Sequence, residues 1–134
     1  MTFWAIVRSP LFIGLDLSGD LEASDLAQLT NPRVLAVNSH STNNRQVKAS
    51  AGSYVWAAEQ VGDTVGYYVA LLNHGMQAQE VRASFAEIGI AGSPEECDVV
   101  DVWTGQAQGT AAIAVVAHLP AVTGAQLLWL KGCR

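Results

Sequence analysis

The residues near the start of the chain that could do chemistry are the acidic and hydroxyl side chains of DLSGDLE, residues 16–22. A calcium-binding loop of the EF-hand type needs glycine at its sixth position and glutamate at its twelfth. Counted from Asp16, those positions hold Leu21 and Ala27, so we interpret the segment as a turn that caps a helix. Asp16 is the best single candidate for substrate binding, because it ends a predicted buried parallel strand, where sites commonly lie. Helix capping or loop support remains the favoured role for it.

The other titratable candidates lie apart from one another. His40, His74 and His118 fall in separate predicted elements, with no cysteine or carboxylate at metal-ligand spacing, and we interpret them as turn or rim residues. Asp98 and Asp101 flank two valines on a predicted strand, so they point to opposite faces and cannot share one substrate. The common nucleophile, phosphate-binding and zinc motifs do not occur. We therefore expect no catalytic residue, no metal site and no cofactor in this chain.

Four aromatic residues on predicted strands could stack on sugar rings: Trp56, Tyr67, Tyr68 and Trp103. Aromatic side chains in strands more often fill a core, and that is the interpretation we favour. Tyr67 and Tyr68 are adjacent, and successive side chains of a strand point to opposite faces. We therefore expect one of the two to face outward.

The composition bounds the class of protein. The 134 residues are 50% apolar and 14% charged, with a net charge of -5, so we expect one folded domain. The seven Lys and Arg are scattered, which argues against nucleic acid or an anionic membrane as a partner. Cys97 and Cys133 could form one disulfide or remain two thiols, so the compartment stays open.

The opening segment TFWAIVRSPLFIGLDLSG, residues 2–19, is unusually apolar. A signal peptide would have its basic residue before the apolar run, whereas Arg8 lies inside it. A membrane-spanning helix needs about 20 apolar residues, and Arg8 with Pro10 interrupts the run well short of that. We expect the segment to belong to a protein core rather than to a membrane, and localisation stays open.

Residues 1–44 have the pattern of a helix, a strand and a helix, typical of the end of a βα repeat. Apolar residues from Phe3 to Val7 predict a helix that Pro10 stops, and residues 11–17 predict a strand buried on both faces. Asp20 is the expected N-cap of a second helix through about Thr30. Its apolar stripe, expected to turn inward, consists of Ala23, Leu26 and Leu29. Asn31 is expected to cap a further short helix that starts at Pro32.

Residues 45–134 have a different pattern of apolar and turn residues. The polar stretch 38–52 is expected to be a linker. Six short β-type runs are separated by turn signals and cover residues 53–60, 64–73, 79–88, 97–105, 109–119 and 125–131. This spacing predicts an antiparallel β-sandwich of Greek-key type. The fold class is therefore mainly β, with a partial (β/α) barrel remnant in front of the sandwich.

The order of these segments resembles the C-terminal portion of the α-galactosidase (melibiase) family of glycoside hydrolases. That family typically shows W-A-x-x-x-x-P-L-x-x-G-x-D-L, then a helix ending L-x-N-x-x-V-I-A-V-N. The matching residues are Trp4, Ala5, Pro10, Leu11, Gly14, Asp16, Leu17, Leu29, Asn31, Val34, Ala36, Val37 and Asn38. The later segments YVWAAEQVGDTVGYYVALLNHG, FAEIGI, VVDVWTGQAQG and LPAVTGAQLLWLK resemble the family's C-terminal domain. Residues 39–42 and 123–124 depart from the pattern, where the family usually has Gln-Asp-Pro-Leu-Gly and His-Gly.

The resemblance implies a parent enzyme that removes terminal α-galactose residues with retention, using two carboxylates about 5–5.5 Å apart. In that family both aspartates come from earlier barrel strands, and no carboxylate of this chain matches either. The resemblance thus implies that this part of the enzyme is structural and is inactive alone. A galactoside substrate would bind only through the barrel. The alternative is a stand-alone β-sandwich that binds carbohydrate or a protein partner; a reading frame without function also stays open. The oligomeric state and the exact glycoside stay open too.

Overall fold

The computed structural model describes every residue except 13, 15–18, 20 and 93–95. Its helices are α1 (Thr2–Ile6), α2 (Ala23–Leu29), α3 (Pro32–Ser39) and α4 (Phe85–Ile88). Its strands are β1 (Ser41–Ser50), β2 (Ser53–Gln60), β3 (Gly66–Asn73), β4 (Gln79–Ser84), β5 (Cys97–Asp101), β6 (Ala107–Ala111), β7 (Ala114–Leu119) and β8 (Gly124–Lys131). The expectation of a mainly antiparallel β-sandwich is confirmed.

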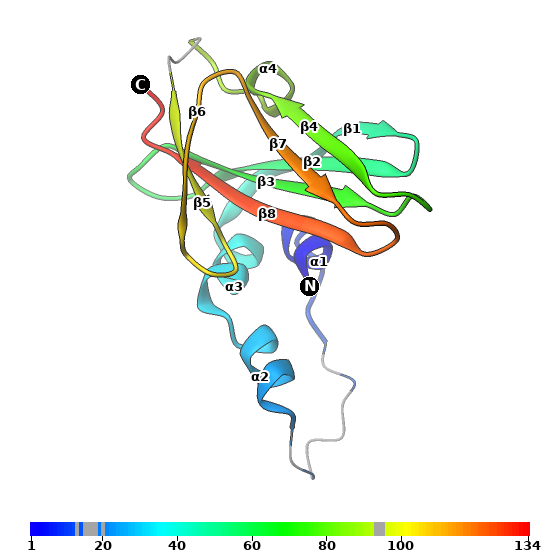
Figure 1. Cartoon of the computed structure of the whole chain (residues 1–134). Coiled ribbons are helices and arrows are strands. Elements are labelled where there is room, and N and C mark those ends of the chain that lie inside the picture. The colour runs from blue at the N-terminus through cyan, green and yellow to red at the C-terminus, as the bar shows by residue number, and fades with distance from the viewer. Residues whose placement is uncertain (13, 15–18, 20, 93–95) are drawn as a thin grey trace.

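The strands form two sheets that face each other (Figure 1). One sheet has six strands in the order β1-β2-β3-β8-β5-β6, and the other pairs β4 with β7. The chain crosses between the sheets after β3, β4, β6 and β7, so β8 enters the large sheet between β3 and β5. Side chains from both sheets alternate into a shared core, as in other sandwiches. Its largest fully buried members are Leu71, Ile88, Leu130, Val55 and Val69.

The polar stretch 38–52 is not a linker, and that prediction was wrong. Most of it forms β1, which pairs with β2 from Ser41↔Gln60 to Ser50↔Ser53. The hairpin turns through Ala51 and Gly52, both with positive φ, as a two-residue turn matched to strand twist requires. An edge strand needs little apolar character, so its composition resembles that of a loop.

Two of the expected β runs divide. The run 79–88 is a strand only to Ser84, whose side chain accepts a hydrogen bond from the Glu87 N–H and so begins α4. The run 109–119 covers the end of β6 and all of β7, which lie in different sheets. Residues 111–117 of this run are all apolar and carry no Gly or Pro at the break, so the sequence pattern did not separate the two strands.

The N-terminal elements are only partly as expected. Asn31 caps α3 by accepting from the N–H groups of Arg33 and Val34, with Pro32 in the first turn, so that prediction is confirmed. Of the strand expected over 11–17, only residues 11, 12 and 14 are described, and they are not in a strand. Asp16 and Asp20 lie outside the described residues. The N-cap of α2 is Glu22, so the expected cap at Asp20 was wrong.

Cys97 and Cys133 form a disulfide that closes a 36-residue separation and fastens the C-terminus to β5. The sequence left open whether the two cysteines form a disulfide or remain thiols, and the structure has the disulfide. None of the described helices has the length and apolar character needed to cross a membrane.

Candidate functional site

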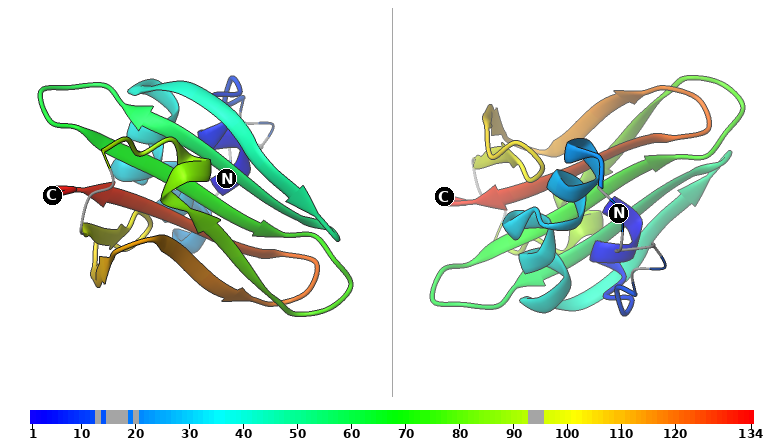
Figure 2. Two further views of the ribbon diagram at one scale, coloured as in Figure 1. Left: turned by 90° about the horizontal axis from the view of Figure 1, so that it is seen from above. Right: turned by 90° about the horizontal axis from the view of Figure 1, so that it is seen from below.

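The helices α1 and α3 lie along the face of the six-stranded sheet that points away from β4 and β7 (Figure 2), whereas α2 extends away from the sheet (Figure 1). A second apolar core holds α1 and α3 to this face. Its helical members are Ala5, Ile6, Val34 and Val37, and its strand members are Ala58, Tyr68, Ala70 and Leu127; Val102 joins it from the turn after β5. The large sheet is therefore packed on both faces, as the nearly continuous burial of β3 shows.

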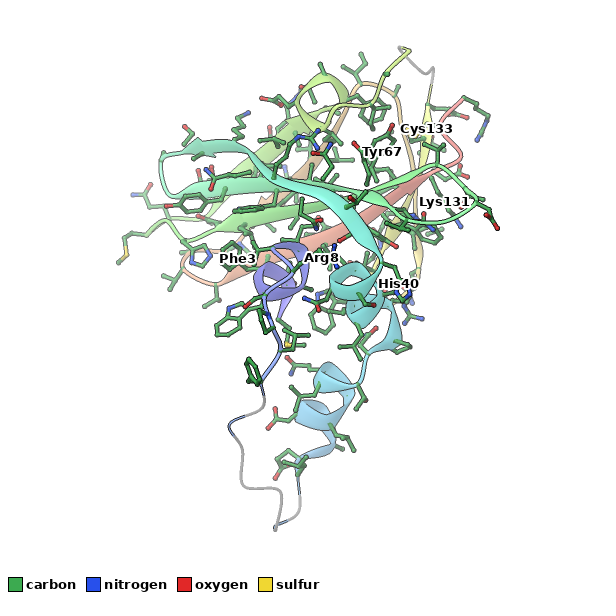
Figure 3. The ribbon with its side chains drawn as sticks, turned by 180° about the vertical axis from the view of Figure 1, so that it is seen from behind. Phe3, Arg8, His40, Tyr67, Lys131 and Cys133 are labelled. Atoms are coloured by element: carbon green, nitrogen blue, oxygen red, sulfur yellow. A yellow bond between two sulfur atoms is a disulfide. The ribbon has the colours of Figure 1, made fainter. Side chains whose placement is uncertain are left out.

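Arg8 joins the end of α1 to the start of the sheet (Figure 3). Its Nε donates to the Asn38 carbonyl at 3.1 Å and its Nη1 donates to the Ser41 carbonyl at 2.9 Å. Asn38 returns the contact, because its Nδ2 donates to the Ser9 carbonyl at 3.0 Å. Asn44 on β1 donates to the Ile6 carbonyl at 2.7 Å. These side chains supply donors to backbone carbonyl groups at the end of α1 and at the junction of α3 with β1.

A second polar cluster joins α3 to the turn after β5. Arg33 donates from Nε to the Val102 carbonyl at 3.0 Å and from Nη2 to the Trp103 carbonyl at 3.2 Å. Asn31 donates from Nδ2 to the same Trp103 carbonyl at 2.8 Å. The Trp103 indole donates to Thr2 Oγ1 at 2.8 Å, which brings α1 into the cluster. The sequence motifs matched Asn31 and Asn38 but did not single out Arg8, Arg33 or Thr2.

Beyond these bonds lies an apolar region that the described residues leave uncovered. No residue of α2 is buried, so the expected inward turn of Ala23, Leu26 and Leu29 was wrong for this chain. Phe12 is 91% exposed, Trp4 56% and Leu26 47%. An open hollow of about 520 Å³ is lined by Met1, Trp4, Leu11, Phe12, Gly14, Leu29 and Leu35. We call Trp4, Phe12, Leu26, Leu29 and Leu35 the open apolar surface.

The polar candidates from the sequence do not converge on one place. Asp98 lies 3.6 Å from the Arg134 guanidinium, whereas Asp101 accepts from the N–H and hydroxyl of Thr104. His118 is exposed and 3.5 Å from Glu80. His40 contacts the Ser39 hydroxyl, and the His74 ring lies edge-on to Tyr54. The described part of the chain contains no cluster of three His, Cys, Asp or Glu residues that could hold a metal.

The four aromatic candidates pack into the two cores. Tyr67 packs against the core between the sheets, while Tyr68, Trp56 and Trp103 belong to the core under the helices. The expectation that Tyr67 or Tyr68 faces outward was wrong, because helices cover the face that would otherwise be exposed. Burial raises the pKa of the Tyr68 hydroxyl above its ordinary value.

The fold is that of the β-sandwich found at the end of certain glycoside hydrolases. The family profile described as the alpha galactosidase C-terminal beta sandwich domain matches residues 50–122, and the chain belongs to that family. It is 30% identical to an α-galactosidase of Lachancea cidri, over 76% of this chain and 24% of that protein. It is 28% identical to one of Coffea arabica, over 87% of this chain and 32% of that protein.

The solved structures agree. A β-L-arabinopyranosidase of glycoside hydrolase family GH27 from Geobacillus stearothermophilus superposes with a TM-score of 0.88 and 27% identity. That match covers 99% of this chain and 29% of the enzyme. The chain therefore spans about a quarter to a third of the length of the relatives it matches.

Proposed function

We propose that this chain serves as the non-catalytic C-terminal part of an α-galactosidase-like glycoside hydrolase. The observation that carries the proposal is the open apolar surface beside the helices. Exposed apolar patches of this kind usually mark a surface that another protein segment covers. The βα units of a catalytic barrel are the partner proposed here, because the relatives extend far beyond the matched segment.

In this proposal the parent enzyme removes terminal α-galactose residues, and the galactoside is bound through the barrel. Residues 1–44 were expected to finish that barrel and 45–134 to form the sandwich, but that border falls within β1. We therefore divide the chain between α3 and β1. The Arg8 and Arg33 bonds cross this division and would transmit the position of the barrel helices to the sheet.

A stand-alone binding module is the second function considered for the sandwich. The four aromatics that motivated it pack into cores, and the relatives are whole glycosidases of which the chain matches a part. No described contact favours this alternative over the first function.

A chimera tests the proposal. The part of the Coffea arabica α-galactosidase that precedes the matched segment would be joined to this chain. Trp4→Ser and Leu26→Ser would then be made in the chimera and in the chain alone. If a barrel covers these residues, each substitution costs about 2 kcal/mol or more in the chimera but under about 0.5 kcal/mol in the chain.

Ile113→Ser is the matched control, because Ile113 is 71% exposed and precedes β7, which lies in the sheet opposite the one that carries α1 and α3. It should change the unfolding free energy little in either protein. Equal sensitivity of chimera and chain to Leu26→Ser would show that the barrel does not cover the open apolar surface, and the proposal would fail.

A further inference from the structure

Strand β7 has one edge that no described strand covers. Its other edge pairs with β4, and these two strands make up the whole small sheet. Figure 2, in the view from above, shows β7 along one rim of the sandwich. A hollow of about 430 Å³ adjoins the strand, and its lining includes Val116 of β7, Thr110 of β6 and Leu128 of β8. The described residues therefore leave room beside β7.

The backbone groups of alternate β7 residues point toward this free edge. The Ile113 carbonyl, directly before β7, accepts at 2.7 Å from the N–H of Phe85, the residue that follows β4. Peptide directions alternate along an antiparallel strand, so Ala114, Val116 and His118 turn their N–H and C=O groups away from β4. None of these groups bonds to a described residue. The edge thus offers a row of donors and acceptors that a further strand can use.

β7 also lacks the features that keep the other edge strands from pairing. β1 carries Arg45 and Lys48 and has two register shifts, and β4 carries Glu80 and Arg82. β6 is five residues long and contains Gly109 at a positive φ. Charges, bulges and short length are the usual protections of a sheet edge. The six residues of β7, AVVAHL, include no Asp, Glu, Lys, Arg, Gly or Pro, and their register with β4 is unbroken.

We propose that β7 pairs with the β7 strand of a second copy of this chain. In an antiparallel register with Val116 opposite Val116 of the copy, these two residues exchange N–H···O=C bonds across a two-fold axis. Ala114 makes the same exchange with His118 of the copy, and its small side chain leaves space for the imidazole. On the inner side of the sheet, the buried Val115 lies opposite Ala117 of the copy.

Charge and symmetry favour a second copy as the partner. No two like charges meet in this register, although each chain carries a net charge of -5. The register also places residues of the same face opposite each other, as a continuous sheet requires. Because β4 already occupies the other edge of β7, pairing stops at two copies. The contact is short, so we expect a weak and reversible dimer.

This inference goes beyond the proposed function and does not depend on it. β7 belongs to the sheet opposite the face that carries α1 and α3. A barrel that covers the open apolar surface therefore leaves the free edge of β7 accessible.

Sedimentation equilibrium of the whole chain, from about 10 μM to about 1 mM, tests the pairing. We expect a reversible monomer–dimer equilibrium without larger species. Val116→Lys sets two like charges opposite each other at the axis and should weaken the dimer at least about fivefold. Val65→Lys is the matched control, because it adds the same charge at a valine that is 74% exposed between β2 and β3. Leu26→Ser, on the open apolar surface, should also leave the equilibrium unchanged.

Val116→Cys tests the register itself with a substitution of similar size. Opposed residues of a hydrogen-bonded antiparallel pair have Cα atoms about 5.5 Å apart, which a disulfide can span. Mild oxidation should therefore link Val116→Cys into a covalent dimer that reductant reverses. Val65→Cys, treated in the same way, should cross-link far more slowly.

Four results would overturn the inference. The chain could be monomeric over the whole concentration range or form species larger than a dimer. Val65→Lys could weaken the dimer as much as Val116→Lys. Leu26→Ser could abolish the dimer, because the open apolar surface would then be the contact. Finally, Val116→Cys could cross-link no faster than Val65→Cys.

Discussion

The indole Nε1 of Trp103 donates to the hydroxyl of Thr2 at 2.8 Å, across 101 positions of sequence. It ties the first helical residue of the chain to the turn that follows β5. A five-residue helix such as α1 has no stability of its own. Burial of Ile6, together with the bonds from Arg8, Asn44 and Trp103, therefore decides whether the helix stays on the sheet.

Thr2→Val tests this tie. Valine keeps the shape of the buried side chain but cannot accept the indole hydrogen, so the unfolding free energy should fall by about 1 kcal/mol. Denaturant unfolding measures the change, and Thr64→Val at an exposed position is the control. If both substitutions have the same small effect, the Trp103 bond does not hold α1.

Asn73 should be the most sensitive polar position of the sandwich. Its fully buried amide donates to the carbonyls of Gln77, Leu119 and Pro120 and accepts from Gly75 N–H and the Gln79 amide. Asn73→Asp places carboxylate charge against three carbonyl oxygens, and we expect a loss of about 3 kcal/mol or more.

Gln77→Glu makes the same amide-to-acid change on an exposed side chain and should cost less than about 0.5 kcal/mol. Where Asn73→Asp does not fold, Asn73→Ser gives a measurable intermediate loss. A protein that tolerates Asn73→Asp as well as Gln77→Glu would refute the role assigned to this amide.

The Cys97–Cys133 disulfide should stabilise the chain mainly by restricting its unfolded state. For a separation of 36 residues the loop-closure argument gives about 3–4 kcal/mol. Intact-mass measurement should find the protein lighter by two hydrogens than its reduced form, and reduction should lower the denaturation midpoint. The Cys97→Ala/Cys133→Ala double variant should no longer respond to reductant; an equal response in that variant would contradict the prediction.

Glu87 gives the sandwich a small, pH-dependent contribution. Hydrogen bonds from the Ser84 N–H and hydroxyl, with Lys48 nearby, lower the pKa of this carboxyl below its ordinary value of 4.5. A lowered folded-state pKa means that the stabilisation is present above 4.5 and is lost as the pH falls through the lower value. Glu87→Gln should therefore cost about 0.5 kcal/mol at pH 7 and almost nothing at pH 2–3. If the stability difference between Glu87→Gln and the unmodified protein stays the same at low pH, the charge of the Glu87 carboxylate does not contribute to capping α4.

The sandwich could be predicted from the sequence because most of its strands are bounded by turn residues. β2 coincides with the expected run 53–60, and β8 differs by one residue from the run 125–131. β1 could not be predicted, since an edge strand buries few side chains and its polar residues look like a loop. The burial of both faces of β3 was also beyond the sequence, because one face is covered by helices far away in the chain.

The candidate site was less predictable than the fold. The apolar stripe of α2 was recognised, but periodicity does not reveal what covers the stripe, and here the described residues leave it open. The hollow lined by Arg33, Tyr68, Trp129 and Lys131 combines residues from α3, β3 and β8 that share no local motif. Its cations stand almost a hundred positions apart, so only the folded chain brings Arg33 and Lys131 together.

The central claim is that this chain is a structural part of a glycosidase and holds none of the residues that catalyse the reaction. The most direct measurement is release of the aryl group from an aryl α-galactoside by the purified chain, beside the Coffea chimera at equal concentration. We expect turnover by the chimera and none above the buffer blank by the chain alone. Turnover by the chain alone, proportional to its concentration, would contradict the claim.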